Sequence, residues 1–180
     1  WTDQARFDAA SEGYMHAREA FVEEGELSGV ATCDLGLGWV ALSQQDFPLA
    51  LERIGQALEQ LTRLGARSSI ATAHNMLGEV TRALGQPETS AGHYRQALSL
   101  HQACGSLGGA TIAQLNLAIV LVEAESYEEA HLRVREVMGS MMTQGLEQFL
   151  GAAELIDLVC EGAKGHWDGW MERFDVAEGR

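Results

Sequence analysis

The feature that most constrains this chain is a glycine that recurs at every fortieth position. Its four copies need no insertion or deletion between them: Gly25, Gly65, Gly105 and Gly145. A fixed period of this length indicates one supersecondary unit copied along the chain, and such a unit buries its apolar face only against its neighbours. The spacing therefore predicts a stack of similar units.

Other residue types recur at the same period. Each copy has an aromatic residue or a proline at one phase: Phe7, Phe47, Pro87, Tyr127 and Trp167. Small residues hold a second phase: Ala10, Ala50, Ser90 and Ala130. Large apolar residues hold a third: Tyr14, Ile54, Tyr94, Val134 and Phe174. Columns of this kind allow two elements to approach closely and then fill the space against the next unit.

Within each unit the apolar residues follow a helical spacing. Ile70, Ala73, Leu77 and Val80 lie on one helical stripe. Polar breaks near residues 44–46, 85–87 and 124–126 divide each unit into two helices, and Pro87 suits a first helical turn. The glycine column closes the second helix, and Ser28, Ser68 or Ser69 would cap the next one. We therefore predict an all-α solenoid, an α-α superhelix of antiparallel helix pairs with about nine helices.

The period also predicts where the units begin and end in a single solenoid over 1–180. A partial repeat at 1–26 precedes full repeats at 27–66, 67–106 and 107–146, and a divergent terminal repeat occupies 147–180. The first unit lacks nearly all of its first helix and the chain starts at Trp1, which favours a fragment of a larger protein. Asp157 falls in the column of Leu37, Leu77 and Leu117, so we expect the helix around 149–162 to pack differently.

Charge and composition narrow the classes of partner. With 26 acidic and 12 basic residues the net charge is −14, which disfavours binding to nucleic acid or to an anionic membrane surface. No apolar run approaches the roughly 20 residues that cross a bilayer, and no signal peptide is visible. Three widely spaced cysteines fit a reducing compartment, so we expect a cytoplasmic protein.

Two clusters contain residue types that could carry chemistry. The glycine-rich segment 105–109 lacks the lysine of a phosphate loop and coincides with a repeat junction, which favours an inter-helix turn. His101 and Cys104 share a helix face, but a zinc site needs three or four ligands, so core or surface roles are favoured. We expect no catalytic residue, no metal and no cofactor.

The repeat columns resemble a known family. Leu37 and Gly38, followed by Ala50, Ile54 and Ala57, match the spacing of the tetratricopeptide repeat (TPR). The usual unit has about 34 residues. The longer unit of this chain resembles the variety found in kinesin light chains and in arrays attached to bacterial Ser/Thr kinases and ATP-dependent transcription regulators.

The resemblance implies a concave groove lined by the first helix of each unit. Carried onto this sequence, the groove positions that could contact a partner are Leu35, Trp39, Leu42, Asn75, Met76, Glu79, Arg82, Asn116 and Ile119. Trp39 is the expected anchor, because aromatic residues dominate binding energy in grooves. The alternative interpretation is that Leu35, Leu115 and Ile119 pack between neighbouring units and leave a shallow groove.

The resemblance also implies a function. The expected role is a protein-binding scaffold without catalytic activity, holding a peptide or a partner helix in the groove. The alternative is a self-association or regulatory sensor region of a bacterial multidomain signalling protein, a kinase or transcription regulator whose catalytic part lies elsewhere. Exposed apolar ends of the solenoid would permit homo-oligomers.

Overall fold

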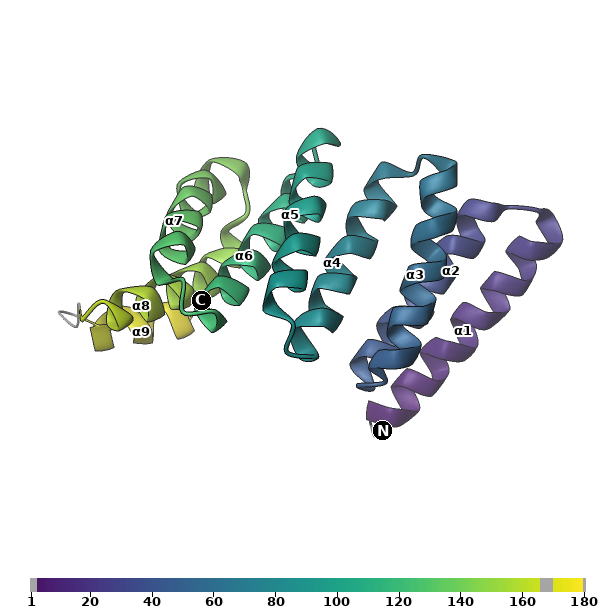
Figure 1. Ribbon diagram of the computed structural model, residues 1–180, viewed down its shortest axis with the longest axis horizontal. Coiled ribbons are helices and arrows are strands. Elements are labelled where there is room, and N and C mark those ends of the chain that lie inside the picture. The colour runs from purple at the N-terminus through teal and green to yellow at the C-terminus, as the bar shows by residue number, and fades with distance from the viewer. Residues whose placement is uncertain (1–2, 166–169, 180) are drawn as a thin grey trace. The chain divides into compact units, whose positions relative to one another are not determined.

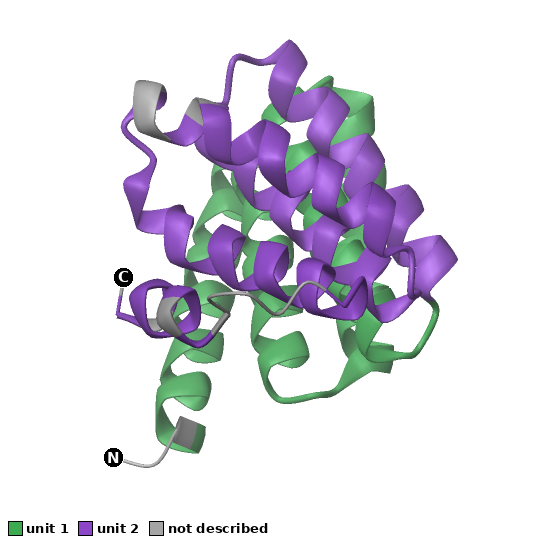
Figure 2. Cartoon of the chain, turned by 90° about the vertical axis from the view of Figure 1, so that its left-hand side faces the viewer, with its two compact units in different colours: residues 1–86 green, residues 87–180 purple. Residues whose placement is uncertain are grey.

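The computed structural model describes residues 3–165 and 170–179, so Trp1 and Trp167 lie outside the described part. The chain divides into two compact units, Trp1–Gln86 and Pro87–Arg180 (Figure 2). Nine α-helices and one short 3-10 helix account for the regular structure of the described residues. The predicted all-α fold of antiparallel helix pairs is therefore confirmed for this part of the chain.

Unit 1 contains four helices, each packed against the next along the chain (Figure 1). They are α1 (Asp3–Glu24), α2 (Leu27–Ser43), α3 (Phe47–Leu64) and α4 (Arg67–Ala83). The first helices of successive sequence units, α2 and α4, also contact one another directly. The core of this unit forms where apolar residues of α2, α3 and α4 meet, around the fully buried Ile54 and Leu61.

Unit 2 repeats this arrangement. It contains α5 (Pro87–Ala103), α6 (Leu107–Glu123), α7 (Tyr127–Gln144), a 3-10 turn η1 (Glu147–Phe149), α8 (Leu150–Ala163) and α9 (Trp170–Glu178). Helix α8 contacts both α7 and α6, as α4 contacts both α3 and α2. Helix α8 therefore keeps the neighbours of its counterparts, while it follows a 3-10 turn and buries Asp157 at the position of their leucines.

The glycine column ends the second helix of each pair, as its spacing predicts. Gly65 and Gly145 follow α3 and α7 with left-handed φ angles of 68° and 69°. Gly has no Cβ and adopts this conformation at little cost, which lets the backbone N–H groups close the last turn. Pro87 is the first residue of α5, where its missing N–H costs no hydrogen bond.

The predicted serine caps are wrong. Helix α2 is capped by the Glu26 carboxylate, which accepts a hydrogen bond of 2.6 Å from the Gly29 N–H. Ser28, Ser68 and Ser69 lie inside their helices, because α2 and α4 begin two or three residues earlier than caps at these serines would require. The Glu26 carboxylate thus performs at the N-cap position the role that a serine hydroxyl commonly performs there.

A second left-handed position follows the first helix of each pair. Gly85 and Gly165 hold it in two copies, with φ angles of 71° and 82°. In the other two copies it is held by Gln45 and Glu125, with φ angles of 62° and 56°. A side chain with a Cβ is strained in this region, so these two turns store backbone energy.

Helix α1 contacts α2 through rings that lie over glycines. A Cβ added to Gly36 would overlap the Tyr14 ring, and one added to Gly29 would overlap the Phe21 ring. Both rings are half-buried, whereas the residues at the same phases in α3, Ile54 and Leu61, are fully buried. The apolar stripe of α1 is therefore only partly covered by α2.

A buried carboxylate also joins α1, α2 and α3. Asp34 on α2 is fully buried and accepts a hydrogen bond of 2.9 Å from Arg18 Nε of α1. Arg53 Nη1 of α3 lies 3.7 Å from the same carboxylate oxygen. A charge taken out of water requires partners of this kind, because an unpaired buried carboxylate costs several kcal/mol.

Candidate partner-binding faces

Helix α2 presents an apolar surface that its own unit does not cover. Only one of its 17 residues, Asp34, is charged, and apolar residues lie all round the helix. Trp39 is 48% exposed on this helix, and Leu42 is half-buried one turn further on. A large ring left half in water at this position is the kind of side chain that anchors a partner.

The neighbouring helix α4, which contacts α2, carries polar groups at the phases of Leu35, Trp39 and Leu42. Asn75 and Arg82 are half-buried and Glu79 is exposed, at intervals of three and four positions that place them on one side of α4. We refer to Trp39, Leu42, Asn75, Glu79 and Arg82 as the α2/α4 face. It combines one apolar anchor with side chains that donate and accept hydrogen bonds.

Two residues expected in the groove are instead part of the core. Leu35 and Met76 are buried in the apolar cluster that surrounds Ile54 and Leu61. They hold α2 and α4 together and offer little area to a partner. The alternative interpretation from the sequence, that Leu35 packs between neighbouring units, therefore describes this residue correctly.

Unit 2 contains an apolar pocket between its own first helices. This α6/α8 pocket has a volume of about 290 Å³ and is lined by Ile119, Val122, Glu123, Leu155, Ile156 and Val159. Ile119 is one of the residues expected to line the groove, and Asn116 lies half-buried on the same helix. Val159 is 46% exposed, so apolar surface remains open to solvent at the pocket.

The α8 side of this pocket was missed by the sequence prediction. Leu155, Ile156 and Val159 lie one repeat period after Leu115, Asn116 and Ile119, so the repeat spacing already marked them. The aspartate at position 157 interrupts the leucine column and obscures the likeness of this helix to the others. The structure places the three residues where the column predicts.

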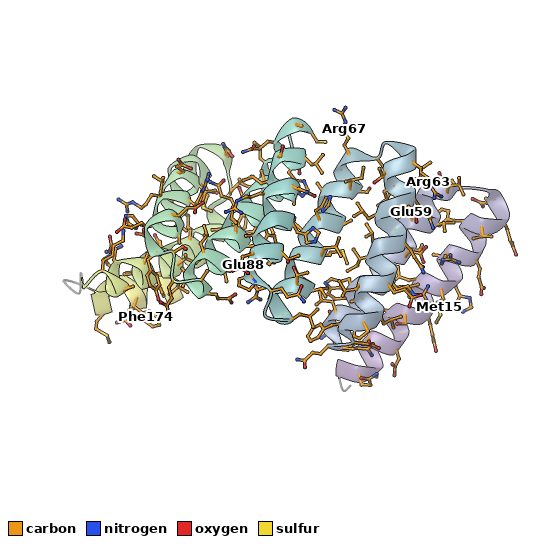
Figure 3. The ribbon with its side chains drawn as sticks, in the orientation of Figure 1. Met15, Glu59, Arg63, Arg67, Glu88 and Phe174 are labelled. Carbon is orange, nitrogen blue, oxygen red and sulfur yellow. The ribbon has the colours of Figure 1, made fainter. Side chains whose placement is uncertain are left out.

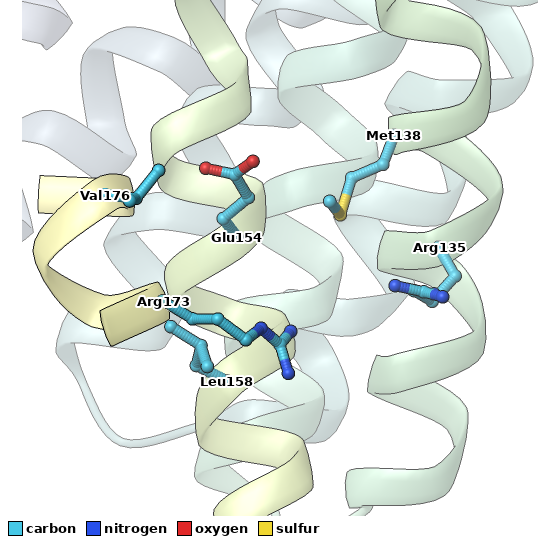
Figure 4. Close-up of a pocket in the computed structure, with 6 residues that line it drawn as sticks. All are labelled: Arg135, Met138, Glu154, Leu158, Arg173 and Val176. Carbon is cyan, nitrogen blue, oxygen red and sulfur yellow. The ribbon is translucent and has the colours of Figure 1, made fainter. Parts of the chain in front are cut away.

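A second cluster lies on the other side of α8 and is ionic. Asp157 is fully buried, with His131 Nδ1 at 2.8 Å, Arg135 Nη1 at 3.4 Å and Arg173 Nη2 at 3.3 Å. The two guanidinium groups reach from α7 and α9 toward the same space (Figure 4), which is a pocket of about 340 Å³. This arrangement fixes α9 to the outer side of α8.

His131, Asp157 and Glu161 lie close enough together to be considered as metal ligands, since their ligand atoms are within 4.8 Å of one another. Arg173 hydrogen-bonds to both carboxylates, and this bond lowers the pKa of Glu161. Glu161 in turn raises the pKa of Arg173. The guanidinium groups supply the positive charge that a metal ion would bring, so the cluster is satisfied as an ion-pair network.

The remaining candidate side chains have structural environments. Burial raises the pKa of the Cys33 and Cys160 thiols, so neither favours the reactive thiolate. Cys104 is exposed and free. His101 is buried against Gly109, and burial lowers its pKa. His101 and Cys104 therefore take the core and surface roles that the sequence favours.

Comparison with known proteins agrees with this geometry. Residues 69–140 match the family model of the tetratricopeptide repeat. This match identifies residues 69–140 as tetratricopeptide repeats. Proteins of the TPR family act in general as scaffolds for other proteins and are typically not catalysts.

One solved structure shows that the likeness of fold extends over nearly the whole chain. BtubC (BKLC) from P. vanneervenii is 17% identical in sequence, with a TM-score of 0.79 over 98% of this chain and 73% of that protein. Helices α1, α8 and α9, outside the residues matched by the family model, thus share in the likeness of fold. No curated protein sequence matches this chain significantly. Among the described helices, none is both long and apolar enough to cross a membrane.

Proposed function

We propose that this TPR chain is a non-catalytic interaction module that binds a peptide or helix of another protein on the first helices of its units. The observation that carries the proposal is the apolar character of α2 and α6. Each has a single charged residue among 17. A helix that is apolar all round is normally covered on every side, yet Trp39 on α2 is half exposed and Ile119 on α6 lines an open pocket.

The two faces offer different kinds of contact to a bound peptide. The α6/α8 pocket offers a concave apolar site, and the α2/α4 face offers one aromatic ring beside polar groups that could hydrogen-bond a peptide backbone. The alternative role, as a sensor region within a larger signalling protein, would use the same faces to hold another part of that protein. In either case the bound element is polypeptide.

Trp39 provides the direct test. Peptides selected from a random display library on the intact chain would be measured by fluorescence anisotropy against Trp39→Ala. We expect at least about tenfold weaker binding of peptides that use this face, since an aromatic hot spot contributes about 2 kcal/mol or more.

Met15→Ala is the matched control. Met15 projects from α1 (Figure 3) and is 48% exposed, the same fraction as Trp39. Far-UV circular dichroism confirms that both variants keep their helices. If no selected peptide distinguishes Trp39→Ala from Met15→Ala, and none is weakened by substitutions in the α6/α8 pocket, the proposed function is wrong.

Self-association is a second candidate function, favoured by one observation. The apolar stripe of α1 is only half-buried at Ala10, Tyr14, Ala17 and Phe21, whereas the matching stripe of α3 is fully buried. A helix from a second copy could complete it. Light scattering over a range of protein concentrations tests this role, and a constant monomer mass would exclude it.

A further inference from the structure

The basic residues of unit 2 are distributed unevenly. Residues 87–180 contain fourteen acidic and six basic residues. Every described lysine and arginine among them lies within ion-pair distance of a carboxylate. The pairs are Arg95–Glu129 at 3.7 Å, Arg133–Glu129 at 3.6 Å, Arg135–Asp157 at 3.4 Å, Lys164–Glu128 at 2.8 Å and Arg173–Asp157 at 3.3 Å.

None of these cations lies on the helices that form the α6/α8 pocket. They belong to α5, α7, α9 and the residue after α8, whereas α6 and α8 contain no lysine or arginine at all. Glu123 lines the pocket at the last residue of α6, and the exposed Glu125 follows in the next turn. A helix carries partial negative charge at its C-terminus, so this end of the pocket favours a cation.

We propose that the α6/α8 pocket takes a partner segment that inserts a bulky apolar side chain and carries lysine or arginine beside it. The inference rests on the proposed function and names the chemistry of its partner. A volume of about 290 Å³ lies at the lower limit of small-molecule sites, about 300–1,000 Å³, and suits one or two large side chains. The aliphatic lining supplies the affinity, and the acidic surroundings select the charge.

An acidic partner segment would meet the opposite conditions. No guanidinium or ammonium group on α6 or α8 is present to pair with its carboxylates. The excess of acidic residues in the unit would also repel it during approach. We therefore expect the pocket to prefer a basic peptide over an acidic peptide that has the same apolar residues.

Three synthetic peptides test the charge preference. Each is labelled with fluorescein and has the same length, and two place four leucines at helical spacing with either lysines or glutamates at the polar positions. The third keeps the lysines and replaces the leucines with serines. Binding to the whole chain is followed by anisotropy. We expect the leucine–lysine peptide to bind at least about tenfold tighter than either of the others.

Two pairs of variants locate the site. Val159→Ser should weaken the leucine–lysine peptide about fivefold, whereas Leu132→Ser, which alters a 58%-exposed leucine on α7, should leave it unchanged. Glu123→Lys should reduce the preference for lysine over glutamate about tenfold. Glu136→Lys changes the charge by the same amount at an exposed position on α7 and should reduce it far less.

Equal binding of the lysine and glutamate peptides would overturn the inference, as would equal losses in Val159→Ser and Leu132→Ser. Tight binding of the serine–lysine peptide would show that nonspecific charge attraction is sufficient for binding, and it would also overturn the inference. A different result would contradict the proposed function than would contradict this inference. If library peptides that depend on Trp39 or Val159 prove acidic, the chain is still a peptide-binding module and only the partner chemistry assigned here is wrong.

Discussion

At the scale of single residues, the turn at Gln45 holds backbone strain that the glycines at Gly85 and Gly165 avoid. Its φ of 62° is left-handed, whereas glycine occupies the same phase at Gly85. We predict that Gln45→Gly raises the free energy of unfolding by about 0.5–1 kcal/mol, because relief of the Cβ clash exceeds the added entropy of the unfolded chain. Urea denaturation measures the change. Gly85→Ala is the reverse substitution and should destabilise, and a gain in stability there would contradict this account.

His101 makes stability depend on pH in a defined direction. Burial lowers its pKa below the ordinary value of about 6.5, so the unfolded chain takes up a proton before the folded chain does. Its stabilising contribution is complete above that value and is lost as pH falls. Between about pH 7 and about pH 5.5 we expect the free energy of unfolding to decline.

Replacement of His101 by phenylalanine should flatten that decline. Phenylalanine already occupies the equivalent position, where Phe21 lies over Gly29 as His101 lies over Gly109. His93 also has a pKa lowered by burial, so part of the slope remains. Denaturant curves at the two pH values provide the measurement, and an unchanged slope in His101→Phe would rule out this residue as the source.

At the scale of helices, the contact between α1 and α2 depends on the absence of a side chain. A Cβ at Gly36 would overlap the Tyr14 ring. We predict that Gly36→Ala lowers the free energy of unfolding by about 1–3 kcal/mol. Gly55→Ala is the control, because a Cβ there meets no atom and α3 should gain about 0.5–1 kcal/mol from better helix propensity. Equal effects of the two substitutions would show that the Tyr14 contact is unimportant.

Helix α9 is held through Arg173, which reaches both Asp157 and Glu161 on α8. Arg173→Ala should cost about 1–2 kcal/mol, less than the loss of a sole partner, because His131 and Arg135 remain near the buried carboxylate. Amide hydrogen exchange should become faster in α9 before it does in α7. Arg95→Ala removes a surface ion pair and should leave exchange in α9 unchanged.

The sequence predicted these elements well because their signals are local. The spacing of glycines and apolar residues depends only on neighbours along one helix, so the left-handed ends at Gly65 and Gly145 could be predicted. The strained turns at Gln45 and Glu125 could not, because neither residue type marks a left-handed backbone. The buried Asp34 was missed for another reason: its arginine partners lie on two other helices, α1 and α3.

For the binding faces too, local features could be predicted from the sequence and features that depend on contacts between helices could not. Trp39 and Ile119 were expected in the groove from the family resemblance; Trp39 is 48% exposed and Ile119 lines the α6/α8 pocket. Leu35 and Met76 were also expected in the groove yet are buried, whereas Asn75 and Asn116, one repeat later in their columns, are half-buried. Side chains in one column share a phase on the helix, and their exposure is decided by the neighbours in space.

At the scale of the whole molecule, a net charge of −14 opposes the folded state through self-repulsion. The buried pairs at Asp34 and Asp157 are poorly screened by salt, whereas repulsion between exposed carboxylates is screened strongly. We predict that raising NaCl from about 50 mM to about 300 mM increases Tm by about 2–4 °C, equivalent to about 1 kcal/mol. Circular dichroism follows the transition, and a fall in Tm would show that ion pairs outweigh the repulsion.

The buried aspartate on α2 has a consequence for how such a chain finds its alignment while folding. A repetitive chain can pair a helix with the wrong copy of its neighbour, one period out of place, and still bury apolar surface. At the phase of Arg18 the other described second helices carry Leu58, Leu98, Met138 and Glu178. Only α1 thus has an arginine at this phase, so an alignment shifted by one repeat would remove the Arg18 hydrogen bond from Asp34 and leave Arg53 of α3 as the cation beside the buried carboxylate. The ion pair between Arg18 and Asp34 therefore favours the native alignment of α1 and α2 over one shifted by a repeat.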